Sequence, residues 1–331
     1  MTPVELSRTV LSAVRRAVEA GELSVTVPER VVVTVPGPGG CGDYASNIAL
    51  QLARAAEQQP LRVAEILKAH IEEADGVEGV VVTGPGFLNI SLRQGLDATA
   101  LVREILEFGA VYGHSDALAG QVVELRVPYE ARAEVVADAL VRIVATQGGR
   151  VEIEHREPVN LRPVPAPEDP APLGPDAARW ALLHPAPHDR PRITADHLVQ
   201  REGNPLFRIR YAHARTRAVG RGAARLGFTA EPGDLARPGD VAETDVRPLL
   251  TALADHPRTL TAAATHRAPD RLARHLVTVA DAALPFLLTV LPHGEEKPSA
   301  AHRARLALAE AVGTVLAGGL SLLGIDAPEH L

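Results

Sequence analysis

The chain has 331 residues, of which 46% are hydrophobic and 23% charged, a composition typical of globular domains and not of disordered chains. Its single cysteine excludes a disulfide framework and a thiolate zinc cluster, and fits a reducing compartment. The net charge of −7 argues against a protein that binds nucleic acid over its whole surface, so such binding would require a local basic patch.

The N-terminal residues carry charges throughout, unlike the apolar core of a signal peptide. No stretch reaches about 18 consecutive apolar residues, the length needed to cross a bilayer. We therefore expect a cytoplasmic protein without a membrane span.

The first 117 residues are predicted to form an α+β N-terminal domain. Its first helix follows a capping box at residues 2–5, and its apolar residues recur at every fourth position until Gly21: Leu6, Val10, Val14 and Val18. The apolar pattern then predicts a strand at 31–35, helices at 44–57 and 62–73, two strands around the turn 84–86, and a closing helix at 95–109.

Residues 118–157 are predicted to form a short βαβ unit. A β-branched strand at 122–127 leads into an Ala/Val-rich helix that ends at Gly148 and Gly149, and a second strand follows at 151–153. Such a unit normally opens a nucleotide-binding sheet and holds its ligand in the turn after the first strand. Here that turn reads Pro-Tyr-Glu-Ala-Arg at 128–132 and contains no glycine, histidine or lysine.

Residues 158–191 contain ten of the 27 prolines and are predicted to be a linker or an irregular surface segment. The remaining residues, 192–331, are predicted to form an all-α helical bundle with a kink at Pro285 in its third helix. Helical periodicity places the bundle helices at about 193–226, 246–264, 268–291 and 298–323.

Two other patterns suggest ligand sites but fit simpler interpretations better. The glycine-rich loop at 36–43 lacks the lysine and the spacing of a phosphate-binding loop, so we interpret it as a tight turn in which Asp43 caps a helix. His184 and His188 have prolines between them and no carboxylate or cysteine cluster nearby. We therefore predict no metal, no cofactor and no catalytic residue.

The strongest charge feature lies at 201–225, where seven arginines accompany a single acidic residue. Arg210, Arg217, Arg221 and Arg225 are spaced to lie along one helix face, with Arg201, Arg208 and Arg215 on a neighbouring stripe and Tyr211 and His213 interleaved. A solvated basic face is the ordinary outcome of such a pattern. The same stripe is also what contact with a phosphate backbone requires.

Several blocks, in the same order, resemble arginyl-tRNA synthetase. GDYASNIALQLAR at 42–54 and GPGFLNISL at 84–92 are similar to two segments of that family's N-terminal additional domain. GPDAARWALL at 174–183 is similar to the end of its catalytic domain, and NPLFRIRYAHAR at 204–215 to the start of its DALR-type anticodon-binding bundle. The ending GLSLLGIDAPEHL resembles the family's last helix and its Ala-Pro-Glu-Arg-Met terminus.

The resemblance also implies what this chain lacks. In the family, the first strand of the βαβ unit runs into a His-x-Gly-His turn that grips ATP, and a lysine-bearing ATP signature precedes the closing segment. Neither stands at the corresponding places, and no lysine occurs from 69 to 296. We therefore interpret residues 118–157 as a truncated remnant of the catalytic domain and predict that the chain is not an enzyme.

By the same resemblance, tRNA is the expected partner, with arginine tRNA suggested by the family name. Phe87 and Asn89 occupy the positions that recognise a D-loop nucleotide, although core packing of Phe87 and a turn role for Asn89 are equally open. Leu331 replaces the family's terminal methionine. The predicted tRNA-binding residues are Phe87, Asn89, Asn204, Arg208, Arg210, Tyr211, His213, Arg215, Arg217, Arg221 and Arg225.

Three hypotheses follow for the function. The first is a non-catalytic synthetase-like protein that binds tRNA, through the N-terminal domain at the D-loop and through the bundle at the anticodon stem. The second is a protein-interaction module that holds a synthetase or a biosynthetic enzyme, and the net charge of −7 favours it. The third is an arginine–tRNA ligase with ATP-dependent aminoacylation.

Overall fold

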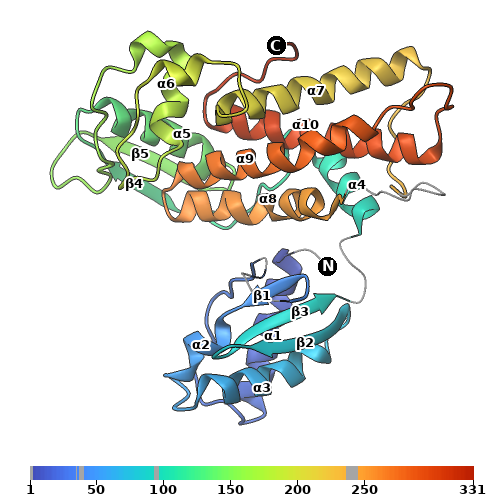
Figure 1. Ribbon diagram of the computed structural model, residues 1–331. Helices are drawn as coiled ribbons and strands as arrows, with labels where there is room; N and C mark the ends of the chain where they lie inside the picture. Colours follow the sequence, from blue (N-terminus) through green and yellow to red (C-terminus); the bar gives the residue numbers. More distant parts are fainter. Residues whose placement is uncertain (1–2, 35, 37–40, 93–96, 236–244) are drawn as a thin grey trace. The chain divides into compact units, whose positions relative to one another are not determined.

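The computed structural model describes all residues except 1–2, 35, 37–40, 93–96 and 236–244 (Figure 1). The chain forms two compact units, residues 1–97 and residues 98–331. The sequence instead predicts a first boundary near residue 117. The helix expected to close the first domain, α4 (Ala98–Phe108), instead belongs to the second unit, because it packs against helices of the bundle.

The first unit is an antiparallel three-stranded sheet covered by helices. Its strands β1 (Tyr44–Ser46), β2 (Val77–Thr83) and β3 (Phe87–Leu92) are ordered β1-β3-β2, so β3 is central. The helices are α1 (Pro3–Glu19), α2 (Ile48–Ala53) and α3 (Pro60–Glu72). The apolar residues at every fourth position of α1 point into a core that also contains Leu88 and Ile90 of β3.

Three local expectations in this unit are corrected. In the predicted strand at 31–35, the described residues form only one isolated bridge, Thr34 to Ala45. The helix predicted from residue 44 begins at Ile48, because residues 44–46 are buried and pair with β3 as β1. Asp43 does not cap that helix, since its carboxylate accepts a hydrogen bond from the Leu92 amide at 2.8 Å. Half of the glycine-rich loop, residues 37–40, lies outside the described residues.

The second unit begins its α/β part with the predicted βαβ arrangement. Strands β4 (Val122–Arg126) and β5 (Arg150–Glu154) are parallel, and α5 (Ala131–Ala145) connects them. One face of this small sheet packs on α5, while β5 is largely exposed. Two strands with one covered face match the truncated unit that the sequence predicts.

The proline-rich segment 158–191 is anchored by one buried cation. Arg132, at the start of α5, is 0% exposed, and its guanidinium donates hydrogen bonds of 2.7–3.0 Å to five backbone carbonyls. These carbonyls belong to Val164, Leu182, Pro185, Ala186 and Asp189. Asn160 adds hydrogen bonds to the edge of β4. The segment therefore folds onto the βαβ unit, and within it α6 (Gly174–Leu183) forms a regular helix.

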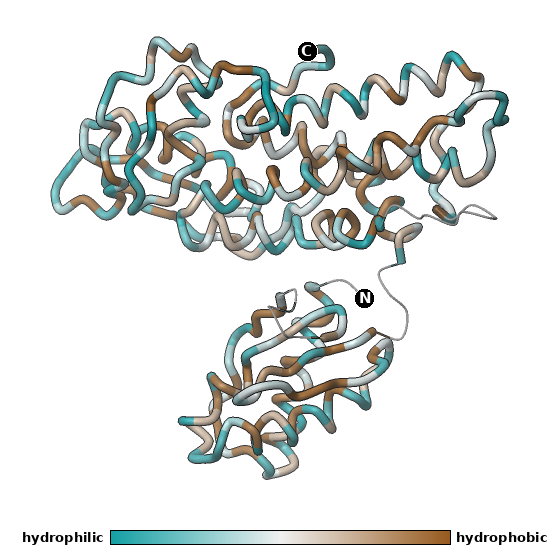
Figure 2. Tube along the Cα trace, viewed as in Figure 1, coloured by the Kyte–Doolittle hydropathy of each residue, from teal (hydrophilic) through white to brown (hydrophobic). Residues whose placement is uncertain are grey.

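The rest of the second unit is a helical bundle. Its helices are α7 (Pro205–Arg225), α8 (Arg247–Thr265), α9 (Pro269–Phe286) and α10 (Ala300–Leu322), preceded by the 3₁₀ turn η3 (Ala195–Leu198). Helix α10 is the most enclosed, with neighbours α4, α7 and α9. Hydrophobic residues recur along every bundle helix between hydrophilic ones, as Figure 2 shows.

Two boundaries in the bundle differ from the expected ones. The helix predicted from 193 begins at Pro205, because Asn204 caps it and proline favours the first helical position. Pro285 does not kink α9 in mid-helix, since the helix ends one residue later and continues as the 3₁₀ turn η4 (Leu287–Thr289).

Among the described residues, two bundle segments are long and apolar enough to cross a membrane, Pro269–Thr289 and Ala300–Leu322. Half of the apolar window of the first and 67% of that of the second are buried inside the bundle. Their apolar residues thus already pack against protein, as those of core helices do.

Candidate nucleic-acid interface

Phe87 lies at the end of the β2–β3 hairpin and is 41% exposed. It borders a cavity of about 220 Å³ whose other lining residues come from residues 32–51 of the same unit. Among them, the Gln51 amide donates a 2.8 Å hydrogen bond to the Asn47 side chain. A half-exposed ring beside two polar amides is an arrangement that can stack on a base and contact its edge.

Asn89 takes no part in this surface. It is 2% exposed, and its amide nitrogen donates to the Val81 carbonyl at 3.2 Å and the Thr83 hydroxyl at 2.7 Å. Its oxygen accepts a hydrogen bond from the Cys41 amide at 3.3 Å. The side chain is thus used inside the unit. The polar groups beside Phe87 are those of Asn47 and Gln51, which are not among the residues predicted from sequence.

At the start of α7, Asn204 is likewise a structural residue. It is 5% exposed, accepts from the amides of Leu206 and Phe207, and donates to two carbonyls of the preceding turn. One turn later, the rings of Phe207 and Tyr211 stack with centroids 5.6 Å apart. Tyr211 is 39% exposed and is the more accessible ring of this pair.

Six of the seven predicted arginines lie on α7, and we call them the arginine row: Arg208, Arg210, Arg215, Arg217, Arg221 and Arg225. Arg201 is not among them, because it precedes the helix and pairs with Asp196 at 2.6 Å. Within the described residues, the side chains of Arg215 and Arg225 form no hydrogen bond or ion pair. The other four each contact a side chain from elsewhere in the second unit.

The partners of these four arginines are mostly acidic. Arg208 lies 3.3 Å from Asp281 of α9, and Arg210 pairs with Asp176 of α6. Arg217 donates two hydrogen bonds to one Glu329 oxygen, at 3.0 and 2.7 Å, and Arg221 lies 3.4 Å from the His330 ring. No local sequence signal reveals these partners, because they lie 34 to 112 positions away along the chain.

Residues 325–331, which we call the tail segment, thus run along α7. The Arg210 guanidinium donates to the Asp326 carbonyl at 3.0 Å, and a ring nitrogen of His213 lies 3.0 Å from the Pro328 carbonyl oxygen. His213 is 5% exposed, and its burial lowers its pKa below the ordinary value. It therefore fixes the tail segment and does not present a free ring to a ligand.

A groove of about 910 Å³ opens beside this contact. Helix α7 lines it with Arg217, Gly220 and Arg221, α10 with Glu310 and several small residues, and the tail segment with Ala327 and Glu329. Small side chains give the groove its depth, and Arg221, which has no acidic partner in the described residues, places positive charge at its edge. The groove is therefore a surface on which a charged backbone can lie.

At the carboxyl ends of β4 and β5, the turn after β4 holds an exposed ring. Tyr129 is 86% exposed and stacks on His155 with centroids 4.3 Å apart. The Glu130 carboxylate accepts from the amides of Arg132 and Ala133, so it occupies the N-terminus of α5. No group of three or more His, Cys, Asp or Glu side chains in the described residues could hold a metal ion.

Two family models match the chain. The model of the arginyl-tRNA synthetase N-terminal domain matches residues 5–92. The model of the DALR anticodon-binding domain matches residues 209–331. The two matches fall on the N-terminal unit and on the bundle that carries the arginine row.

Curated relatives are similar in sequence to this chain over part of their length. The arginine–tRNA ligase of Renibacterium salmoninarum is 40% identical over 168 residues, which cover 47% of this chain and 30% of the relative. That of Frankia alni is 39% identical over 165 residues, with coverages of 47% and 30%. The match thus spans less than a third of either relative.

Solved structures support the fold. The arginyl-tRNA synthetase of Thermus thermophilus superposes with a TM-score of 0.67 at 15% identity, covering 100% of both chains. That of Plasmodium falciparum gives a TM-score of 0.67 at 9% identity, covering 99% of both chains. At such identities the likeness concerns the fold alone.

The prediction that this chain is not an enzyme is contradicted by the relatives, which are named arginine–tRNA ligase, an enzyme. That prediction used the absence of two motifs from one stretch of sequence, and missing motifs do not measure activity. The family interpretation itself is confirmed by both domain models and by the fold. The chain is an arginyl-tRNA synthetase-related protein that carries that family's N-terminal domain and its DALR anticodon-binding domain around a short βαβ unit.

Proposed function

We propose that the chain binds tRNA through two surfaces, one on each unit. On the bundle, the arginine row and the adjoining groove contact the phosphate backbone. On the N-terminal unit, Phe87 stacks on an unpaired base whose edge faces Asn47 and Gln51. The observation that carries the proposal is the concentration of arginines on α7 in a chain whose net charge is −7.

The arginines divide into two groups in this proposal. Arg210 and Arg217 have carboxylate partners, Asp176 and Glu329, so their charge is largely neutralised within the protein. Arg215, Arg221 and Arg225 have no acidic partner in the described part of the chain. Of these, Arg221 and Arg225 are the best placed to neutralise phosphates, because Arg221 lines the groove and Arg225 lies one helical turn further along α7.

Titration of tRNA binding against salt tests the bundle surface. Each phosphate contact contributes a slope of about −0.9 in log K against log salt on duplex and about −0.7 on single strands. We expect Arg221→Gln combined with Arg225→Gln to make the slope shallower by about two contacts. The matched control is Arg62→Gln with Arg150→Gln, which removes the same charge from exposed positions off this surface. Equal slopes in the test and control variants would reject the surface.

Arginine–tRNA ligation is a second candidate function, because the relatives that are 40% and 39% identical carry that name. ATP–pyrophosphate exchange in the presence of arginine measures the first step of this reaction. Turnover above a no-enzyme control would support the candidate. Its absence at micromolar enzyme would leave tRNA binding as the function.

A protein-interaction module is a third candidate, favoured by the internal pairing of Arg208, Arg210 and Arg217. Affinity capture before and after nuclease treatment separates it from tRNA binding. A defined partner that is retained after nuclease supports the module, and loss of all captured material with the RNA argues against it.

A further inference from the structure

The end of α10 is built to turn the chain onto α7. The amide of Ile325 donates to the Leu320 carbonyl and that of Gly324 to the Ser321 carbonyl, both at 2.9 Å. Gly324 has a φ of +71° and Ile325 is 3% exposed, so Leu-Leu-Gly-Ile forms a Schellman termination with its apolar contact. The tail segment begins at this turn.

Two guanidinium groups lie next to Gly324. A Cβ at position 324 would lie 2.5 Å from Arg179 Nη1 and 2.8 Å from Arg142 Nη2, so a larger residue there would displace these two groups. Arg142 also donates through Nε to the Leu322 carbonyl at 2.9 Å, which satisfies a carbonyl in the last turn of α10. The two arginines come from different elements, α5 and α6.

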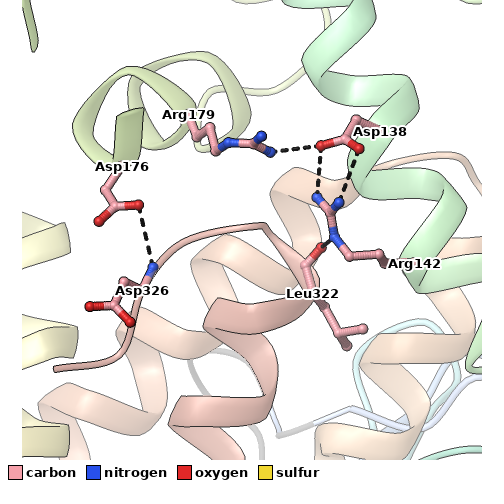
Figure 3. A network of polar contacts seen from close by, with 6 residues as sticks. All are labelled: Asp138, Arg142, Asp176, Arg179, Leu322 and Asp326. Carbon is pink, nitrogen blue, oxygen red and sulfur yellow. Dashed lines mark hydrogen bonds and ion pairs between the residues drawn. The ribbon is translucent and has the colours of Figure 1, made fainter. Parts of the chain in front are cut away.

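One carboxylate holds both arginines in place. Asp138 of α5 accepts from Arg142 at 3.0 and 3.1 Å and from Arg179 at 2.6 Å, as Figure 3 shows. Partial burial raises the pKa of Asp138, but the hydrogen bonds and charges of the two arginines outweigh burial and lower it. Without this negative charge, two adjacent guanidinium groups would repel each other at the Gly324 turn.

The same cluster continues onto the tail segment. Asp176, three residues before Arg179 on α6, accepts from the Asp326 amide at 3.4 Å (Figure 3). Asp176 also pairs with Arg210 of α7. Glu329, three residues after Asp326, forms an ion pair with Arg217. The position of Glu329 thus depends on where the chain leaves α10.

We infer that Asp138 is a positioning residue for the tail segment: through Arg142 and Arg179 it fixes the Gly324 turn and thereby keeps Glu329 on Arg217. The inference rests on the proposed function for its consequence. With the tail segment in place, Arg217 is neutralised and Arg221 and Arg225 face the phosphates. If the segment is released, Arg217 becomes a further phosphate contact. The βαβ unit thereby helps to set which arginines RNA meets.

Salt titration of tRNA binding to the full chain tests whether Asp138 positions the tail segment. We expect Asp138→Asn to steepen the slope by one contact, about 0.7 to 0.9. Glu329→Gln frees Arg217 directly and should give the same change. The double variant should match either single variant, because both changes release the same arginine. Asp138→Glu keeps the charge and should keep the wild-type slope.

The control is Glu152→Gln, which alters the net charge by the same amount and releases Arg150 on β5. An Asp138→Asn slope equal to that of the wild type or of this control overturns the inference. So does a double variant whose slope change is the sum of the two single changes, because Arg142 and Arg179 would then contact phosphate themselves.

Arg179→Gln distinguishes positioning of the tail segment from direct phosphate contact, because the two predict opposite changes in the salt slope. It removes a positive charge, so direct phosphate contact by Arg179 predicts a shallower slope. Positioning predicts a steeper slope, since one of the two groups that hold Gly324 is lost. This variant also carries the test if Asp138→Asn lowers the helical circular dichroism signal.

Amide hydrogen exchange tests the positioning without RNA. Peptides that cover 325–331 should exchange faster in Asp138→Asn than in the wild type, and should be unchanged in Glu152→Gln. Equal exchange in all three proteins overturns the inference. If the wild type binds no tRNA, the proposed function fails, and hydrogen exchange alone then decides whether Asp138 positions the segment.

Discussion

Two histidines at the centre of the bundle are buried without full hydrogen bonding. His256 of α8 and His275 of α9 have ring centroids 5.3 Å apart, and His256 also stacks on Tyr112. Nδ1 of His256 and Nε2 of His275 have no hydrogen-bond partner in the described structure. Burial lowers the pKa of His275 from 6.5 to about 4, with a smaller upward effect of Asp255 and a downward one of Arg258. Burial also lowers the pKa of His256 well below 6.5, and His275 and His114 add to this.

Because His256 and His275 are buried in the neutral form, we expect the folded bundle to lose stability in acid. Both rings stay neutral in the folded bundle, whereas the unfolded chain takes up protons near pH 6.5. Stability is therefore complete above about pH 6.5 and falls as the pH drops towards 4. Each histidine contributes about 1.4 kcal/mol per pH unit in this window. Urea unfolding between pH 7.5 and 4.5 measures the slope.

His275→Leu removes one of the two groups, so it should reduce that slope by about 1.4 kcal/mol per pH unit. His188→Leu is the control, because that side chain is 85% exposed. Equal slopes for the wild type and His275→Leu would show that protonation of His275 does not destabilise the folded bundle.

We expect substitutions at Phe87 and Asn89 to affect different properties, tRNA affinity for Phe87 and folding stability for Asn89. Asn89→Ala leaves buried groups without their partners and should destabilise the N-terminal unit by about 1–3 kcal/mol. Phe87→Ala should instead weaken tRNA binding by about 1–3 kcal/mol, roughly 5- to 150-fold, through lost stacking. Thermal unfolding and a binding titration on both variants check the split. A loss of affinity in folded Asn89→Ala equal to that in Phe87→Ala would contradict it.

At the scale of elements, α10 contains two adjacent glycines with opposite roles. A Cβ on Gly319 would lie 2.4 Å from a methyl carbon of Leu276 in α9, whereas nothing lies within 4 Å of one on Gly318. Gly319 therefore allows α9 and α10 to approach closely, and Gly318 has no such constraint.

Alanine substitutions at these glycines should change stability with opposite signs. Gly318→Ala should stabilise by about 0.5–1 kcal/mol, the difference in helix propensity. Gly319→Ala should destabilise by about 1–3 kcal/mol, because the packed core cannot absorb the methyl group. Chemical denaturation of both variants measures the difference. Stabilisation by both substitutions would contradict the close approach.

Elements with strong periodicity were predictable from sequence, and those set by distant partners were not. The bundle helices and the parallel βαβ unit follow from runs that show a clear period. Strand β1 has only three residues, too few for a period of two, and its pairing with β3 decides its conformation. The sequence shows seven arginines, but it cannot show that Asp176 and Glu329 neutralise two of them.

At the scale of the whole molecule, residues 1–97 and 98–331 each have a buried core of their own. We therefore expect two calorimetric transitions. Asn89→Ala should lower only the transition of the first unit, and Gly319→Ala only that of the second. A single transition that both variants lower together would show that the two cores unfold as one.

In the proposed function, the chain binds tRNA through arginines on α7. Equilibrium binding of tRNA to the full chain across a salt series, with Arg221→Gln/Arg225→Gln measured in parallel, tests it most directly. We expect binding at low salt with a linear dependence of log K on log salt, and a slope shallower by about two phosphate contacts in the double variant. No binding of tRNA by the wild-type chain at low salt would contradict it.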